Sequence, residues 1–209
     1  MTQSNTNRRP IRARSSAAAN ALARWLTRHN ISPNQISLAS IFFAAIGAWA
    51  LLAISPVRGA LLCAVCIQLR LLCNLFDGMV AIEGGRKTPT GDLYNEFPDR
   101  VADSVLLVAL GYACGIAWLG WFNALGAALT AYIRVSGAAL GLGHDYRGPM
   151  AKQQRMAVMT LACLATALEW SLRGTHNSLA AAAGIIAVGV ALTCCTRTMA
   201  IAGQLRAKA

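Results

Sequence analysis

Residues 74–103 read NLFDGMVAIEGGRKTPTGDLYNEFPDRVAD, and this stretch decides the fold. It holds six of the chain's eight acidic residues, although the protein carries a formal net charge of +11. The segments on both sides of it are apolar enough to cross a bilayer. A carboxylate at membrane depth costs roughly 2.5 kcal/mol or more on insertion scales, so acidic residues placed there mark a functional site by default.

The polar residues of this stretch recur at helical spacing. Asn74 and Asp77 are three residues apart, and Asn95, Asp99 and Asp103 follow one another at intervals of four. Each set therefore lies on one face of a helix. Two such faces turned toward each other would concentrate oxygen ligands around a hard divalent cation.

The composition predicts an all-α integral membrane protein. Of the 209 residues, 56% are hydrophobic and only 13% are charged, about half the charged share of soluble domains. Helices are expected because a spanning segment must satisfy its own backbone hydrogen bonds. Six transmembrane helices are predicted near residues 36–54, 57–83, 91–113, 116–141, 154–172 and 178–200. Close helix packing is expected at three glycines, Gly47, Gly184 and Gly189.

The N-terminal part divides into two segments. Residues 1–15 form a polar, basic arm that is expected to be flexible. Residues 16–29 are amphipathic and predict a helix that lies in the membrane interface, although a short soluble helix packed on the core fits the pattern equally well. Residues 16–209 are expected to form a single membrane domain.

The distribution of positive charge predicts the orientation. The N-terminal arm, the 84–90 and 142–153 loops and the C-terminal tail are basic, whereas the other connections hold only Arg58 and Arg173. The positive-inside rule then places both termini in the cytoplasm of a multi-pass protein of the inner membrane. The basic residues form no continuous stripe, so we expect anionic membrane lipids and no nucleic acid as partners.

The acidic stretch resembles the signature of the CDP-alcohol phosphatidyltransferase family, D-x-x-D-G-x-x-A-R-x8-G-x-x-x-D-x-x-x-D. Asp77-Gly78, Ala81, Gly91 and Asp99 match it in identity, and the spacing matches throughout. Residues 32–37, SPNQIS, are similar to the segment that precedes the first span in that family. The six-span plan extends the resemblance over most of the chain.

The resemblance implies a metal-dependent transferase of phospholipid biosynthesis. Such an enzyme moves a phosphatidyl or substituted phosphate group from a CDP-alcohol, here CDP-diacylglycerol first of all, to the hydroxyl of an acceptor alcohol and releases CMP. The family resemblance also implies a homodimer and one or two Mg²⁺ or Mn²⁺ ions. The four signature carboxylate positions correspond to Asn74, Asp77, Asn95 and Asp99, and Asp99 takes the place of the general base.

The chain departs from the signature at three positions. Asn74 and Asn95 replace two aspartates, and Ile82 replaces the arginine. An amide oxygen still coordinates Mg²⁺ or Mn²⁺ but brings no charge, which favours weaker binding or a single ion. Nearby acids could compensate, namely Glu96, which is included among the candidate metal ligands, and Glu83, Asp92 and Asp103.

Two further groups of residues complete the expected site. The resemblance implies that the nucleotide lies against a small-residue surface made by Asp77, Gly78, Ala81 and Gly91. A basic group near the cytoplasmic ends of the later spans suits an acceptor phosphate, because guanidinium groups bind phosphate in a bidentate manner. Its members are Arg134, Lys152, Arg155 and Arg197. Snorkelling toward lipid headgroups is the alternative for these side chains.

Three alternatives remain open from the sequence. The acidic residues could form buried salt bridges with Arg70, Arg100 and Arg134. For Asp103, Glu83 and Asp92, this is at least as plausible as a functional role. The two amides could mark a CDP-lipid-binding protein with impaired catalysis. A small divalent-cation transporter is the third alternative, although arginines beside the acids would repel its cargo.

Overall fold

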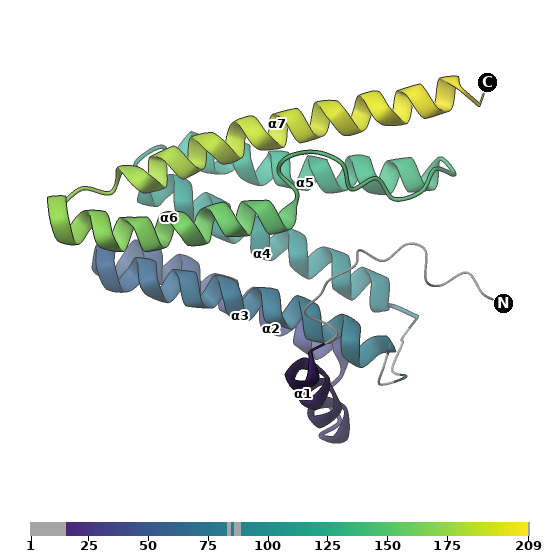
Figure 1. The fold of residues 1–209 in the computed structure, drawn as a ribbon, viewed down its shortest axis with the longest axis horizontal. Coiled ribbons are helices and arrows are strands. Elements are labelled where there is room, and N and C mark those ends of the chain that lie inside the picture. The colour runs from purple at the N-terminus through teal and green to yellow at the C-terminus, as the bar shows by residue number, and fades with distance from the viewer. Residues whose placement is uncertain (1–15, 83–84, 86–88, 209) are drawn as a thin grey trace.

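The computed structural model describes residues 16–82, 85 and 89–208, and within this part the protein consists of seven α-helices (Figure 1). The helices are α1 (Ala17–Arg28), α2 (Pro33–Ala53), α3 (Pro56–Ile82), α4 (Gly91–Ala113), α5 (Ala117–Ala139), α6 (Lys152–Arg173) and α7 (Asn177–Arg206). Each predicted segment coincides with one helix to within a few residues, apart from the longer C-terminal end of α7. The all-α fold class is confirmed. Glu83 and the basic residues of the arm and of positions 86–88 lie outside the described residues.

Four of the helices are long and apolar enough to cross a membrane. These are α2, α3, α6 and α7, with mean hydropathies of 2.1, 1.9, 1.2 and 2.1 in their most apolar windows. The protein therefore contains several membrane-compatible helices, as expected. Helices α4 and α5 are not among these four, so the predicted six spans are matched in part, and α4 carries the acidic stretch.

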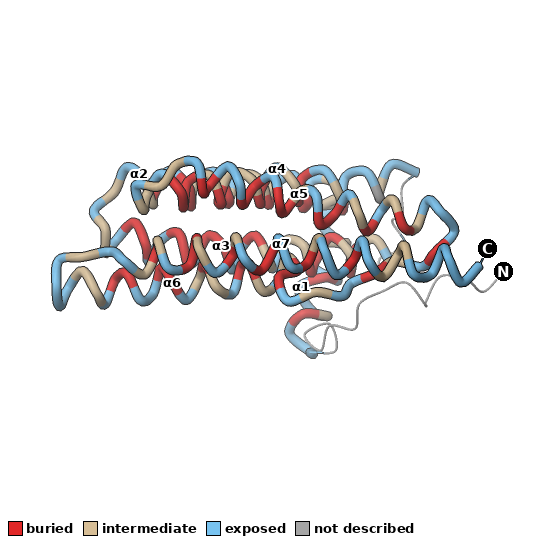
Figure 2. Tube along the Cα trace, turned by 90° about the horizontal axis from the view of Figure 1, so that it is seen from above, coloured by how far each residue is buried: buried red, intermediate tan, exposed pale blue. Residues whose placement is uncertain are grey.

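The six long helices form two layers (Figure 2). Helices α2, α4 and α5 make one layer, and α3, α6 and α7 make the other, with the buried stripes of both layers turned toward each other. Contacts between neighbouring helices join α2 to α4 and α4 to α5 in the first layer, and α3 to α6 and α6 to α7 in the second. The pairs α2–α3 and α5–α7 hold the layers together. Residues facing the seam between the layers are therefore the ones removed from lipid.

Local sequence signals set the helix ends. At α2, Ser32 and Gln35 form a capping box, and Pro33 occupies the first turn, where its missing N–H costs nothing. The α6 helix ends at Gly174, which adopts a left-handed φ of 66°. Glu169 of α6 accepts the backbone N–H groups of Asn177 and Ser178, both at 2.9 Å, and so caps α7.

Helix α1 crosses the end of the bundle and packs against α3 (Figure 1). Its buried residues are Ala19 and Ala23, while Leu22 and Trp25 are exposed. One face of α1 is thus docked on the protein, and apolar side chains remain on the outside. The structure combines features of the two alternatives that the sequence left open.

Small residues allow a very close approach of α4 and α5. A Cβ atom on Gly111 would lie 2.5 Å from the Cα atom of Gly120. A Cβ atom on Gly47 would lie 3.0 Å from Cys66, and one on Gly189 would lie 2.6 Å from Met150, so these glycines also face close neighbours. The expectation for Gly184 is wrong, because a Cβ there would meet nothing within 4 Å.

We expect Gly111→Ala to destabilise the bundle by about 1–3 kcal/mol, because the added methyl group must push α4 and α5 apart. Thermal unfolding of the detergent-purified protein measures the effect. Gly184→Ala is the matched control, since it adds the same group to a helix where space is open. Equal melting temperatures for the two variants would contradict the packing.

Candidate active site

Asp77 lies on α3 at the seam between the two layers. Its side chain is buried, and Oδ2 accepts a hydrogen bond of 2.7 Å from the hydroxyl of Ser37 on α2. Arg70, two turns earlier on α3, donates to the backbone carbonyl of Asp99 on α4 at 3.3 Å. Helices α3 and α4, which carry the two surviving signature carboxylates, therefore contact each other in this region.

Asp99 lies on α4 and is also buried. Its Oδ2 accepts a hydrogen bond from the ammonium group of Lys152, the first residue of α6. Its Oδ1 is buried and has no hydrogen-bond partner among the described residues. On that side, Nη2 of Arg70 forms a longer ion pair of 3.6 Å with Oδ1. One oxygen of Asp99 thus accepts a hydrogen bond, whereas the other has only the longer ion pair with Arg70.

Asp103, one turn further along α4, is held by two buried arginines. Nη2 of Arg70 donates to Oδ1 at 2.5 Å, and Nη2 of Arg155 donates to Oδ2 at 2.7 Å. This is the buried salt bridge that the sequence offered as the alternative for Asp103. Three carboxylates on α3 and α4 are therefore balanced by three cations, which are Arg70, Lys152 and Arg155.

A pocket of about 170 Å³ opens beside this cluster. It is bounded by α4, α5, α6, α7 and the connection between α5 and α6. Its described lining consists of Glu96, Asp99, Arg100, Thr130, Ala131, Arg134, Tyr146, Ala151, Lys152, Gln153, Arg155 and Arg197. The four basic residues predicted for an acceptor phosphate all line it, although they come from three helices. They are thus brought together around one pocket, and their role in binding an acceptor phosphate stays a prediction.

Glu96 is the acidic residue inside this basic pocket. Its Oε1 accepts a hydrogen bond of 2.6 Å from Arg134, and its Oε2 accepts one of 2.7 Å from Arg100. Arg134 also lies 3.4 Å from Nδ1 of His144, and its guanidinium group lies 5.7 Å from the ring centroid of Tyr146. Both oxygens of Glu96 thus contact arginines. This arrangement favours a role in the pocket over the predicted role as a metal ligand.

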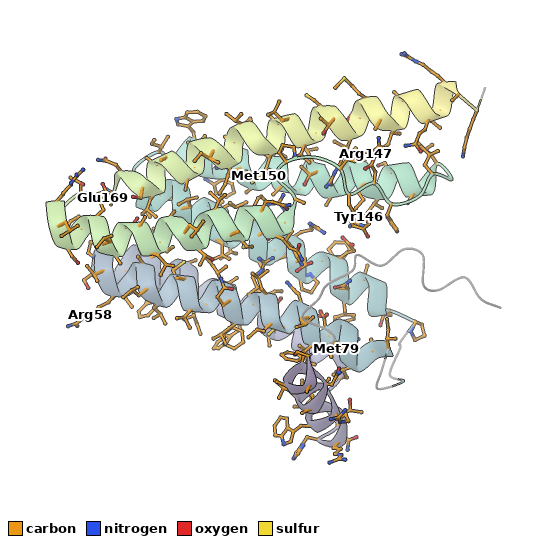
Figure 3. The ribbon with its side chains drawn as sticks, viewed as in Figure 1. Arg58, Met79, Tyr146, Arg147, Met150 and Glu169 are labelled. Atoms are coloured by element: carbon orange, nitrogen blue, oxygen red, sulfur yellow. The ribbon has the colours of Figure 1, made fainter. Side chains whose placement is uncertain are left out.

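The connection between α5 and α6 forms one wall of the pocket and doubles back along α5 (Figure 1). Figure 3 shows Tyr146, Arg147 and Met150 along this connection. The hydroxyl of Thr193 on α7 accepts the Met150 N–H at 2.9 Å, and Nε of Arg197 donates to the Arg147 carbonyl at 2.8 Å. Helix α7 therefore fixes this wall through backbone groups.

The remaining predicted residues lie along α3 and the start of α4. Asn74 is half-buried, and its Nδ2 has no hydrogen-bond partner among the described residues. Asn95 is exposed, Gly78 and Ala81 are half-buried, and Gly91 begins α4. Of the predicted nucleotide residues, none belongs to the described lining of the pocket. Asp77, Gly78 and Ala81 lie on α3, and Gly91 lies at the start of α4.

The donor set is unlike a conventional cluster of charged ligands. Within residues 16–82, 85 and 89–208, no three His, Cys, Asp or Glu side chains gather closely enough to hold a metal ion. The two amides explain this, since Asn74 and Asn95 stand where the family signature has carboxylates.

Four residues at the site were not predicted to take part in its chemistry. Ser37 contacts Asp77, Arg70 holds Asp103, and Thr130 and Tyr146 line the pocket. Ser37 belongs to the SPNQIS segment, so that motif could have indicated it. Tyr146 lies in a connection with no motif, and no signal in the sequence points to it.

Comparisons with known proteins agree with this geometry. Residues 30–195 match the family model described as CDP-alcohol phosphatidyltransferase. The chain is 36% identical over 189 residues to an archaetidylinositol phosphate synthase of Aeropyrum pernix, covering 90% of this chain and 92% of that protein. It is 26% identical to the inner membrane protein YnbA of Escherichia coli, covering 87% and 90% of the two chains.

Solved structures show the same fold. The phosphatidylinositol phosphate synthase PgsA1 of Mycobacterium tuberculosis with CDP-DAG bound superposes with a TM-score of 0.71 at 18% identity, covering 89% of this chain and 94% of that one. The same protein in complex with manganese and citrate also gives 0.71 at 18% identity, covering 88% of each chain. The chain belongs to the CDP-alcohol phosphatidyltransferase family, a family of metal-dependent membrane enzymes of phospholipid synthesis.

Proposed function

We propose that this protein transfers a phosphatidyl or other substituted phosphate group from a CDP-alcohol to the hydroxyl of an acceptor alcohol, with release of CMP. The observation that carries the proposal is the buried Asp99 carboxylate at the edge of a pocket lined by arginine and lysine side chains, on a helix that contacts the helix of Asp77. Phosphoryl transfer depends on positioning and on neutralising charge at phosphorus, and these two features supply both. The donor that we favour is CDP-diacylglycerol, because the similar PgsA1 structure contains CDP-DAG.

The oxygen-rich faces of α3 and α4 fit a divalent cation. Mg²⁺ and Mn²⁺ prefer oxygen ligands, and the buried Oδ1 of Asp99 has no hydrogen-bond partner among the described residues. We propose Asp77 and Asp99 as the charged ligands, with Asn74 and Asn95 as neutral ones. When bound, the ion would neutralise charge on the phosphate oxygens of the donor. Two carboxylates in place of four favour a single ion.

The chain's own residues then divide the remaining work. The carboxylate of Asp99 borders the pocket and is placed to accept the proton of the acceptor hydroxyl. Gly78, Ala81 and Gly91 leave room for the nucleotide beside α3 and the start of α4. Ser37 orients Asp77 by donating to Oδ2.

The pocket indicates a phosphorylated acceptor. Its five basic side chains are Arg100, Arg134, Lys152, Arg155 and Arg197, and arginine forks match the geometry of a phosphate. The name of the Aeropyrum pernix relative specifies a product that contains inositol phosphate. We therefore propose a phosphorylated alcohol, with inositol phosphate as the first compound to test.

The two-layer bundle supports a proposal for the membrane arrangement. We propose that α2 to α7 all cross the bilayer as six spans, that residues 16–209 form one domain, and that α1 lies in the cytoplasmic interface on anionic lipids. Both termini would face the cytoplasm of an inner membrane, and the working form would be a homodimer. The exposed Leu22 and Trp25 of α1 support its interfacial position.

We expect purified protein to release CMP from CDP-diacylglycerol only when Mg²⁺ or Mn²⁺ and a suitable acceptor are both present. The acceptors to compare are inositol phosphate, glycerol phosphate, free inositol and serine. EDTA should abolish the release and added Mn²⁺ should restore it, because Asp77 and Asp99 cannot neutralise the donor phosphates themselves. The proposed function would be refuted if, with each of these acceptors, the wild type released no more CMP than Asp99→Ala.

A further inference from the structure

Lys152 lies between the acidic cluster and the basic pocket. It is the first residue of α6, its side chain is 24% exposed, and its ammonium group donates to Oδ2 of Asp99. The same side chain lines the pocket beside Arg134 and Arg155. The Lys152 ammonium group can thus reach either the Asp99 carboxylate or an acceptor phosphate that binds in the pocket.

Lys152 and the two buried arginines hydrogen-bond different carboxylates. Asp103 already receives Arg70 and Arg155, and both of these guanidinium groups are buried. Among the described residues, Lys152 is the cationic side chain that donates a hydrogen bond to the Asp99 carboxylate. Arg70 lies beyond hydrogen-bond distance of the Asp99 carboxylate, at 3.6 Å. If Lys152 moves away, Asp99 therefore loses this hydrogen bond and keeps only the longer ion pair with Arg70 among the contacts named here.

A divalent cation at Asp99 and the Lys152 ammonium group compete with each other. Both need the same carboxylate, and two positive charges a few ångströms apart repel strongly in a poorly hydrated site. Lysine carries its charge on a four-carbon stem with free rotation, so the ammonium group can move while the backbone of α6 stays in place.

We propose that Lys152 and the divalent cation are alternative partners of Asp99, and that cation binding moves the Lys152 ammonium group into the acceptor pocket. This inference rests on the proposed function, because it takes Asp99 as a cation ligand and the pocket as the site of the acceptor phosphate. Lys152 is then a positioning residue that couples the two sites. Each ligand raises the affinity of the other, since coupling between binding sites is reciprocal.

The first test measures Mn²⁺ binding to detergent-purified protein through the electron paramagnetic resonance signal of free Mn²⁺. We expect Lys152→Met to bind Mn²⁺ more tightly by about fivefold or more, within the usual range of coupling between sites. Lys152→Arg keeps the charge and should stay close to the wild type. Lys208→Met removes a lysine from outside the pocket and is the matched control. Unchanged or weaker Mn²⁺ binding in Lys152→Met overturns the inference, as does equal tightening in Lys152→Arg.

The second test measures binding of inorganic phosphate by titration calorimetry with and without Mg²⁺. In the wild type, Mg²⁺ should tighten phosphate binding. In Lys152→Met this gain in phosphate affinity should fall by about fivefold or more. Pairing of Mg²⁺ with free phosphate in solution affects both titrations equally, so it cancels when the two proteins are compared. An equal gain in both proteins contradicts the coupling. Gel filtration shows whether each variant elutes as the wild type does.

Asp77→Asn separates this inference from the proposed function. If the wild type binds Mn²⁺ no better than Asp77→Asn, then the cation site itself is wrong. If Asp77→Asn abolishes Mn²⁺ binding while Lys152→Met binds like the wild type, then the site is right and only the role of Lys152 fails.

Discussion

Asp99→Asn should lower the rate of CMP release by a factor of about 10³ or more, because the substitution removes both a charged cation ligand and the proposed base. The amide keeps the size of the side chain, so the packing of α4 should persist. The loss should appear in kcat, with little change in the KM for the CDP-alcohol if Asp77 still holds the nucleotide side of the site. Steady-state CMP release in detergent micelles measures both constants.

Glu169→Gln is the matched control for Asp99→Asn. It also changes a carboxylate to an amide, but Glu169 caps the start of α7 and contacts Thr175 and Ser178, away from the pocket. Its activity per folded molecule should equal that of the wild type. Retention of more than a tenth of the activity by Asp99→Asn would show that another group takes the proton.

Arg70→Met should have the largest effect on stability, costing about 3 kcal/mol or more. Arg70 is fully buried and donates to the Asp103 carboxylate and, at 3.3 Å, to the Asp99 carbonyl. Removing one member of a buried ion pair leaves the opposite charge with too little compensation, which costs about 3–5 kcal/mol. Thermal unfolding of the purified protein, followed by circular dichroism, measures the loss.

Two variants make this prediction specific. Arg58→Met removes an exposed arginine from the start of α3 and should change stability by about 0.5 kcal/mol or less. The double variant Arg70→Met/Asp103→Leu should recover part of the loss, because it removes the stranded charge as well. A double variant that is as unstable as the sum of the single ones would mean that the two residues do not interact.

Sequence periodicity was sufficient for the helices because the apolar segments are long and their boundaries carry clear signals. The α2 start is an example, where Ser32, Pro33 and Gln35 form a capping box that can be read directly from the chain. The face that each acidic set occupies on its own helix could also be expected, since intervals of three and four residues fix a helical face. Features that depend only on the helical backbone could thus be predicted from the sequence.

The partners of individual charged side chains could not be predicted from the sequence in the same way. Long side chains such as those of Arg134 and Lys152 reach several positions from one Cα atom, so their contacts depend on the packing of helices far apart in the chain. Glu96 illustrates the point, because its neighbours Arg100 and Arg134 lie one turn along α4 and on α5. The close approach of Gly111 to Gly120 likewise depends on how α4 and α5 pack, which the sequence does not state.

The anchoring of the pocket wall by α7 has a consequence for biosynthesis. Thr193 and Arg197 hold the connection that carries Tyr146 and Arg147, yet they leave the ribosome after every other part of the pocket. The acidic pair on α3 and α4 is therefore assembled early, whereas the binding chamber closes only when the final helix joins the nascent bundle. Premature termination before Thr193 would leave a chain with its carboxylates in place but without a finished chamber.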